Sequence, residues 1–367
     1  SKMQNGTFSV PYDSQRDVYM AMIDDLDAAM ETLYTFASAG DGILMRDFDI
    51  SSFKGDSRLW VSFANTLKLR MAIRMSGVEP EARRIAEEAV RDMATYGLID
   101  ANAENLSFSS DSRQNPFYTQ ATSTSWQDLR SNASIVMYMN AYEDPRRASY
   151  FSKSGYDGIY VGVRAGIQNV TPTDYATYSY PLFAEKDPVP VMYASESWFL
   201  RAEGALLGWT MGDTAENLYN TGVKTSLELW GNGSSYETYI ASETAPALSY
   251  ADPRNKHNVS DFGPAVSVKW ADDGNELERI ITQKWIANHM IGHEAWADVR
   301  RTGYPRLLQV VNNLSGGMWG NVDSSKGIRR LHYPQSEYDN NRENVLKGVE
   351  LLGGSDLHGT DVWWAKK

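Results

Sequence analysis

Apolar side chains recur every three or four residues over several long segments of the chain, the pattern typical of amphipathic helices. The first such segment follows the turn at Pro11 and ends at the Gly40-Asp41-Gly42 break. Its apolar stripe consists of Tyr19, Ile23, Leu26, Met30 and Leu33. We therefore expect a long helix between these two boundaries, with one face packed against the rest of the protein.

Two later segments, 57–96 and 192–230, each predict an antiparallel pair of helices with a short connection. In the first segment, Gly77 follows the end of one helix, and Pro80 lies in the first turn of the next. Both residue types are favoured at those positions. The two segments are similar to the helix pairs of tetratricopeptide proteins, although they are not close copies of each other. A further helical block is expected at 275–312.

The apolar periodicity lapses between the two hairpins, over residues 101–190, where Ser, Asn, Thr, Tyr, Gly and Pro dominate. This stretch is longer than an ordinary connection in a compact domain, and long loops often carry function. Residues 231–270 and 313–367 are similarly irregular. The chain is therefore predicted to be mainly α, with tetratricopeptide-like helical hairpins forming a superhelical scaffold that carries a large loop-rich subdomain.

The composition narrows the class of protein. The formal net charge is −12, from 35 basic and 47 acidic residues, so the phosphates of nucleic acids would be repelled. The sequence has no cysteine, which excludes disulfides, a thiolate nucleophile and cysteine metal ligands. It contains no apolar run of about 18 residues of the kind that spans a bilayer. Aromatic residues make up 12% of the chain, enough to supply both a core and a surface that stacks on a flat apolar ligand.

Five segments of the chain carry distinctive motifs. One is the stretch 281–306, which combines two tryptophans, a tyrosine and an arginine pair. The other four are 55–60 followed by Asn65-Thr66-Leu67-Lys68-Leu69-Arg70, the turn Asp144-Pro145-Arg146-Arg147, 193–196 with Arg201-Ala202-Glu203, and 329–334 with Trp363-Trp364. Their order and spacing cover nearly the whole chain. Together they resemble the SusD/RagB family, the cell-surface glycan-binding lipoproteins of Bacteroidota, and the pattern is closest to the SusD-like type 2 branch.

The resemblance implies a single SusD-like domain over residues 1–367. Within it, 57–96 and 192–230 are helical hairpins, 101–190 is a loop-rich ligand-binding insertion, and 275–367 is the C-terminal signature region. Family members usually begin with a lipidated cysteine and further N-terminal helices. This sequence contains neither, so we expect an N-terminal lipoprotein part to be missing from it.

The resemblance also implies a function. It indicates a non-enzymatic protein that binds a polysaccharide or oligosaccharide on the extracellular face of the outer membrane. The protein would deliver this ligand to a SusC-like TonB-dependent transporter for nutrient uptake. Its only membrane attachment would be the N-terminal lipid anchor, and no cofactor is expected.

Two carboxylates in the stretch 281–306 allow a catalytic interpretation. Glu294 and Asp298 are one helical turn apart and could form an acid/base pair. A glycosidase, however, needs two carboxyls on either side of the scissile bond, about 5–9.5 Å apart across a cleft. Because Arg300 and Arg301 follow closely, we interpret the carboxylates as members of an ion-pair network in the scaffold. No catalytic residue is predicted.

Two histidines in the same stretch allow a metal-binding interpretation. His289 and His293 are four residues apart and could bind a metal from one helix face. The order of residues is His-x-x-x-His-Glu rather than His-Glu-x-x-His, and no third ligand lies nearby in the sequence. Gly292 also weakens the helix between them. No metal site is predicted.

The loop-rich region supplies the chemistry of a sugar site. A pyranose ring presents a flat C–H face to an aromatic side chain, and its hydroxyls need polar partners at the rim. The predicted ligand-binding residues are Gln114, Asn115, Phe117, Tyr118, Trp126, Gln127, Asn132, Tyr156 and Tyr160. Two other functions remain open: a glycoside hydrolase on an α-helical scaffold, and a peptide-binding or tetratricopeptide-type interaction protein.

Overall fold

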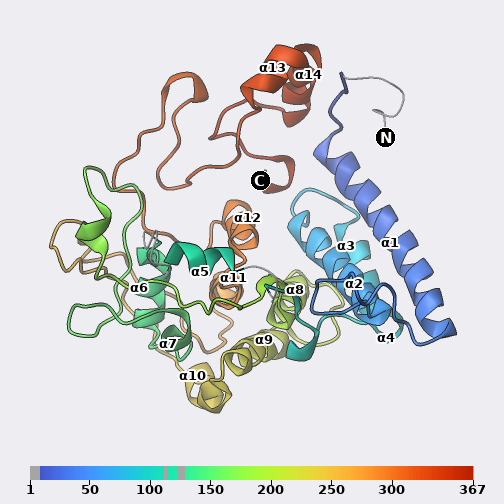
Figure 1. Cartoon of the computed structure of the whole chain (residues 1–367), viewed down its shortest axis with the longest axis horizontal. Helices are drawn as coiled ribbons and strands as arrows, with labels where there is room; N and C mark the ends of the chain where they lie inside the picture. Colours follow the sequence, from blue (N-terminus) through green and yellow to red (C-terminus); the bar gives the residue numbers. More distant parts are fainter. Residues whose placement is uncertain (1–8, 111–113, 122–128, 367) are drawn as a thin grey trace.

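The computed structural model of the chain describes residues 9–110, 114–121 and 129–366, which form a mainly α structure (Figure 1). The predicted fold class is confirmed. The described residues contain one sheet, in which β1 (Leu106–Phe108) pairs antiparallel with β2 (Val189–Met192). The α-helices are α1 (Gln15–Ala39), α2 (Ser57–Arg74), α3 (Ala82–Arg91), α4 (Met93–Tyr96), α5 (Pro116–Ala121), α6 (Ala133–Ala141), α7 (Arg147–Tyr150), α8 (Ala194–Leu206), α9 (Ala215–Leu229), α10 (Tyr236–Ile240), α11 (Glu276–Ala287), α12 (Gly292–Thr302), α13 (Gln335–Asn340) and α14 (Arg342–Leu352).

Helix α1 packs along α2, as its apolar stripe predicts. The side chain of Ser14 caps α1 by accepting a hydrogen bond from the backbone N–H of Asp17 at 3.1 Å. Asp56 caps α2 in the same way, accepting from the N–H of Arg58 at 2.8 Å. These caps satisfy N–H groups that have no partner within the helix, so they define where each helix begins.

Helix α8 lies at the centre of the core and packs against α2, α9 and α11. Glycines allow close approach at two points of this packing. A Cβ atom at Gly222 of α9 would lie 3.0 Å from the ring of Phe199 in α8. A Cβ atom at Gly204 would lie 2.6 Å from the sulfur of Met211, in the connection between the two helices. Larger residues at either glycine would push the helix pair apart.

A network of buried ion pairs joins α2, α8, α11 and α12. Its pairs are Arg70–Glu196, Arg74–Glu294, Lys284–Asp298, Arg301–Asp298 and Arg301–Glu203. Burial opposes the ionisation of Asp298, but the charges of Lys284 and Arg301 outweigh that effect and lower its pKa. The interpretation of Glu294 and Asp298 as members of a scaffold network is therefore confirmed.

The Asp-Pro-Arg turn fastens the loop-rich region to the scaffold. Arg146 is fully buried and donates to both carboxylate oxygens of Asp144, at 2.9 and 2.6 Å. It also donates to the Ser226 hydroxyl in α9 and to the Gln283 side-chain oxygen in α11, each at 2.9 Å. One guanidinium therefore links three separate parts of the chain.

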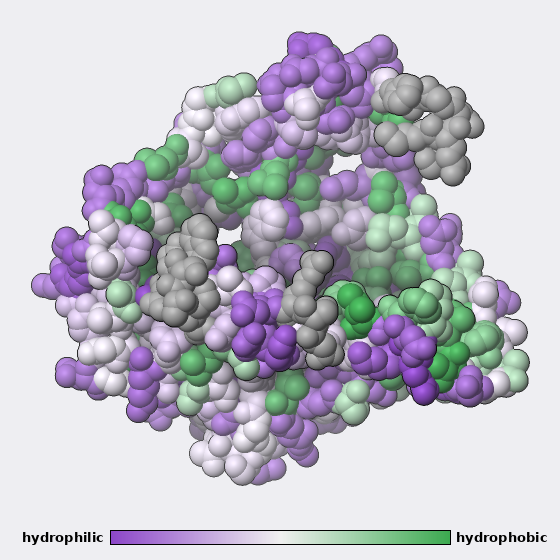
Figure 2. Space-filling model, in the orientation of Figure 1, coloured by the Kyte–Doolittle hydropathy of each residue, from purple (hydrophilic) through white to green (hydrophobic). Residues whose placement is uncertain are grey.

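The C-terminal segment crosses the molecule and then returns to the scaffold. Residues 303–334, all of them described, contain no α-helix and lead to α13 and α14 at the edge of the molecule (Figure 1). Figure 2 shows that this face is hollowed between that segment and the helices below it. Trp363 then packs edge-on against Tyr19, with ring centroids 5.9 Å apart, which ties the end of the chain to α1.

None of the helices in the described ranges is both long and apolar enough to cross a membrane.

Candidate functional site

A cavity of about 490 Å³ lies beside helix α6 in the loop-rich region. It is lined by α6, the start of α7, and two loops around residues 153–162 and 249–251. Its apolar floor includes Val136 and Met137 of α6. Its polar and aromatic lining residues are Asn140, Arg147, Lys153, Tyr160, Ser249 and Tyr250.

Backbone contacts hold one wall of this cavity against the N-terminal end of α6. Asn132 caps the helix by accepting a hydrogen bond from the N–H of Ser134 at 2.8 Å. The N–H of Ala133 donates to the carbonyl of Val163 at 2.9 Å. A Cβ atom at Gly162 would lie 2.6 Å from the carbonyl oxygen of Asn132. Only glycine therefore fits where this loop meets the helix.

The second loop is joined to the first by a tyrosine. Tyr250 is 6% exposed, and its hydroxyl donates to the carbonyl of Gly162 at 2.8 Å. Burial raises the pKa of Tyr250, so the phenol stays protonated and remains a donor. This hydrogen bond joins the two loops that line the cavity.

Three residues form a connected aromatic and polar surface in the cavity. The guanidinium carbon of Arg147 lies 4.8 Å from the ring centroid of Tyr160, within the range of a cation–π contact. Arg147 donates to the side-chain oxygen of Asn140 at 2.9 Å, and Asn140 donates to the backbone carbonyl of Tyr160 at 2.9 Å. The ring of Tyr160 is therefore held in place by both the helix and its own loop.

The predicted residues around α5 lie in a different place. Asn115 is buried, accepts from the N–H of Phe117 at 2.8 Å and donates to the carbonyl of Asp187 at 2.9 Å. It therefore serves as a cap of α5. Phe117 stacks on Phe183, with centroids 5.5 Å apart and planes inclined by 25°.

The other predicted residues near α5 are more accessible. Gln114 is exposed and donates to the Glu185 carboxylate at 3.1 Å. Tyr118 is half-buried. Trp126 and Gln127 lie outside the described residues. None of the described residues of this stretch lines the cavity over α6.

The structure brings two of the remaining predictions together at the cavity. Tyr160 lines it directly, and Asn132 forms the helix cap beside its wall. Tyr156 packs edge-on against Tyr178 at 5.5 Å and does not line it. None of these placements tests ligand contact, so the residue assignments stay predictions.

Sequence reasoning did not single out Asn140, Arg147 or Lys153 as site residues. Arg147 lies within the Asp-Pro-Arg-Arg turn, so the sequence contained a signal for it, although that signal indicated only a family motif. Asn140 lies within an apolar helical run, and Lys153 lies in a loop with no distinguishing pattern. Only their position around one cavity identifies them.

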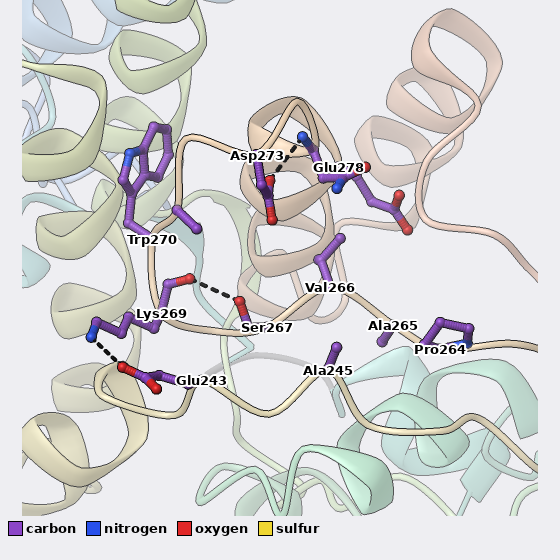
Figure 3. Close-up of a pocket in the computed structure, with 12 residues that line it drawn as sticks. Glu243, Ala245, Pro264, Ala265, Val266, Ser267, Lys269, Trp270, Asp273 and Glu278 are labelled. Carbon is purple, nitrogen blue, oxygen red and sulfur yellow. Dashed lines mark hydrogen bonds and ion pairs between the residues drawn. The ribbon is translucent and has the colours of Figure 1, made fainter.

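A second cavity, of about 540 Å³, lies beside the N-terminal end of α11 (Figure 3). Lys269 pairs with Glu243 at 2.6 Å, and Asp273 accepts from the N–H of Asn275 at 3.0 Å. The indole N–H of Trp270 is bonded to a neighbouring carboxylate. Each of these three polar side chains therefore already has a partner within the protein.

The two histidines weighed as a metal site face different environments. The ring of His289 stacks on Tyr150, with centroids 4.0 Å apart, and burial lowers its pKa to about 3. The side chain of His293 is 69% exposed. Within the described ranges, no group of three or more His, Asp or Glu residues is arranged to hold a metal ion.

The chain matches a known protein family and is similar to several solved structures. The family profile described as "SusD-like: Susd and RagB outer membrane lipoprotein" matches residues 1–365. A chitin-binding SusD homolog from Flavobacterium johnsoniae is 39% identical, with a TM-score of 0.90 over 98% of this chain and 74% of its own. A SusD homolog from Bacteroides uniformis is 41% identical, with a TM-score of 0.90 over 99% of this chain and 75% of its own.

Another SusD homolog, from Bacteroides thetaiotaomicron, is 39% identical, with a TM-score of 0.88 over 98% of this chain and 76% of its own. No curated protein sequence matches the chain significantly.

The tetratricopeptide-like helical scaffold is the fold of the SusD homologues, which are binding proteins rather than enzymes. The chain belongs to the SusD-like family, so the resemblance expected from its motifs is confirmed. Proteins of this family are outer-membrane lipoproteins that bind glycans. The hydrolase alternative does not hold for a member of this family.

Proposed function

We propose that the chain binds an oligosaccharide in the cavity over α6. The observation that carries this proposal is the contact of Tyr160 with Arg147 and Asn140, which combines an aromatic ring with planar polar groups. A pyranose ring needs this combination, because its C–H face packs on an aromatic ring while its hydroxyls need hydrogen-bonding partners. The volume of about 490 Å³ lies within the usual range of small-ligand sites, roughly 300–1,000 Å³.

We propose Gln114, Phe117 and Tyr118 as further contacts for a longer glycan, together with Trp126 and Gln127. The support for this second region is its chemistry, since aromatic side chains alternate there with amides. Asn115 and Asn132 would act on the ligand indirectly, because each holds the end of a helix next to the residues proposed to touch it. Tyr156 would support the site by packing under its loop.

We further propose that the bound glycan is delivered to a SusC-like TonB-dependent transporter on the extracellular face of the outer membrane. The support is membership in a family of outer-membrane lipoproteins. The test is co-purification of the tagged full-length protein with the transporter from detergent-solubilised membranes of its own bacterium. Recovery of the tagged protein without any such transporter would contradict delivery while leaving glycan binding open.

Glycan binding is tested by affinity electrophoresis against a panel of polysaccharides, followed by calorimetry with oligosaccharides of the best hit. Chitin oligosaccharides belong in the panel, because the relative from Flavobacterium johnsoniae is described as chitin-binding. The replacement Tyr160→Ala should weaken binding by about fivefold or more, since truncation of an aromatic residue that anchors a ligand costs about 1 kcal/mol or more.

The matched control is Phe48→Ala, which removes an aromatic side chain that is 79% exposed and lies outside the cavity. This variant should bind like the parent. Equal affinities of the parent and Tyr160→Ala would show that the cavity over α6 is not the site. A parallel Tyr118→Ala variant would then show whether the region around α5 is.

A further inference from the structure

The cavity over α6 has the opposite charge to the protein as a whole. The chain carries a formal net charge of −12, yet the charged residues that line this cavity, within the described ranges, are Arg147 and Lys153. Both are basic. A local excess of positive charge in an acidic protein is not explained by the scaffold, because neither residue joins its ion-pair network.

Among the described contacts, all partners of the Arg147 guanidinium are neutral. Its guanidinium donates to the amide oxygen of Asn140 and lies over the ring of Tyr160. The adjacent Arg146, in contrast, donates to both carboxylate oxygens of Asp144. Arg147 is half-buried and lines the cavity, and within the described ranges no ion pair joins it to a carboxylate.

Lys153 is exposed at the rim, and no ion pair or side-chain hydrogen bond connects it to any residue in the described part of the chain. The carboxylates nearest in sequence do not neutralise this group. Asp157 is exposed and does not line the cavity. Asp252, next to the loop at 249–251, accepts hydrogen bonds from Tyr178 and from backbone N–H groups.

We infer that the cavity over α6 takes an anionic glycan, in which a carboxylate or sulfate group of the sugar bonds to Arg147 and Lys153 while the pyranose ring packs on Tyr160. This inference rests on the proposed function and specifies its ligand class. The guanidinium plane can present two parallel N–H donors to an anion, and the ammonium adds three rotatable donors. An anionic group on the sugar adds Coulombic attraction to these two cations, which a neutral hydroxyl accepting the same hydrogen bonds lacks.

The experiment compares each acidic saccharide with a neutral counterpart of the same skeleton, by calorimetry at 50 and 500 mM salt. Oligogalacturonate and its carboxyl-reduced form test a uronic acid. A chondroitin sulfate oligosaccharide and its desulfated form test a sulfate ester. We expect at least one acidic member to bind about tenfold or more tightly than its neutral counterpart, with the difference shrinking at high salt because the cations are accessible to solvent.

Variants of Arg147 and Lys153 test whether these two cations cause the difference in affinity between acidic and neutral saccharides. Lys153→Met and Arg147→Met should each reduce the ratio of acidic to neutral affinity by about fivefold or more. Lys326→Met is the matched control, since Lys326 is exposed and lies in the C-terminal segment outside the cavity. Its ratio should equal that of the parent. Melting temperatures within a few degrees of the parent verify that each variant is folded.

The outcomes separate this inference from the proposed function. Equal binding of acidic and neutral saccharides, or an acidic preference that survives both cation variants, overturns the anionic ligand class and leaves the glycan-binding function standing. Failure of every saccharide, neutral or acidic, to bind overturns the proposed function and this inference with it.

Discussion

Arg70 in α2 donates two hydrogen bonds to the two carboxylate oxygens of Glu196 in α8, at 2.8 and 2.7 Å. The two side chains are 7% and 0% exposed, and 126 residues separate them in sequence. Lys284 and Glu294 lie within 3.9 Å of this pair and extend it into α11 and α12. Four helices of the scaffold therefore meet at one charged centre, which is surrounded by apolar packing.

Removal of one partner from this centre should destabilise the protein strongly. In Glu196→Leu, Arg70 would remain buried without its bidentate acceptor, and such a loss typically costs about 3–5 kcal/mol. Urea unfolding monitored by tryptophan fluorescence measures this free energy. The double variant Arg70→Met/Glu196→Leu should recover most of the loss, because no unpaired charge is left inside. A double variant as unstable as the single one would show that the charges are needed for more than mutual neutralisation.

The Asp-Pro-Arg turn should depend on the shape of its arginine as well as on its charge. Arg146→Lys keeps the positive charge but cannot reach Asp144, Ser226 and Gln283 simultaneously. We expect a loss of about 3 kcal/mol in the free energy of unfolding, since buried partners would lose charge-assisted hydrogen bonds. The control is Arg91→Lys, at a side chain that is 67% exposed, where a change below about 0.5 kcal/mol is expected. Similar effects of the two changes would contradict the anchoring role of the turn.

His289 should make the protein less stable in mild acid. Burial lowers its pKa from 6.5 to about 3. Above pH 6.5 the side chain is neutral in both states, so its contribution to stability is fully present. Between pH 6.5 and about 3 the unfolded chain takes up a proton that the folded chain does not. Stability therefore falls by about 1.4 kcal/mol per pH unit, or about 2 kcal/mol at pH 5.

A variant isolates this effect from other titrations. His289→Phe keeps a flat ring against Tyr150 but cannot be protonated. Its free energy of unfolding, measured in urea from pH 7.5 to 4.5, should vary less with pH than that of the parent. Parallel curves for the two proteins would rule out His289 as the source of the acid sensitivity. Asp298 cancels in this comparison, because both proteins contain it and its lowered pKa makes the same contribution to the pH dependence of each.

Gly162 should affect stability and ligand binding together. In Gly162→Ala, the new methyl group would lie 2.6 Å from the backbone carbonyl of Asn132, so the loop or the start of α6 must move. Such overpacking costs about 1–3 kcal/mol and would displace Tyr160, two residues away, from the cavity. Gly77→Ala is the control, because no atom lies within 4 Å of its added methyl group. Unfolding curves and glycan affinity are both measured. Unchanged affinity in Gly162→Ala would separate the loop position from the proposed site.

The helical part of the fold follows from local patterns. The stripe from Tyr19 to Leu33 predicted the position of α1, because a helix needs only its own backbone bonds and one apolar face. The carboxylates Glu294 and Asp298 were predicted to be ion-paired from their spacing to nearby arginines. Their strongest partners include Arg74 and Lys284, which lie on other helices. The charge state was therefore predictable from sequence, and the partners were not.

The candidate site was less predictable, because one residue type can serve unrelated purposes. Asn115 and Asn132 were singled out as sugar-binding amides, yet each accepts a hydrogen bond from a helix N-terminus. Asparagine is also a common N-cap residue. The short helices that follow these two asparagines show no apolar periodicity in the sequence, so the caps could not be predicted. Tyr160 was selected as an aromatic residue on a long loop. Its contact with Arg147 could not be predicted, because no local sequence pattern indicates that residues 147 and 160 lie close together.

Arg146 and Arg147 are adjacent in the sequence, but the tertiary structure gives them different environments. The sequence alone determined that both belong to a family motif, that the chain is mainly α, and that it carries no cysteine chemistry. Only the tertiary structure decided that Arg146 is buried against Asp144 while its neighbour faces a cavity beside Tyr160. Successive residues in a helical turn point in different directions, about 100° apart. Their environments are set by distant segments that pack on each side, so identical side chains acquire different partners.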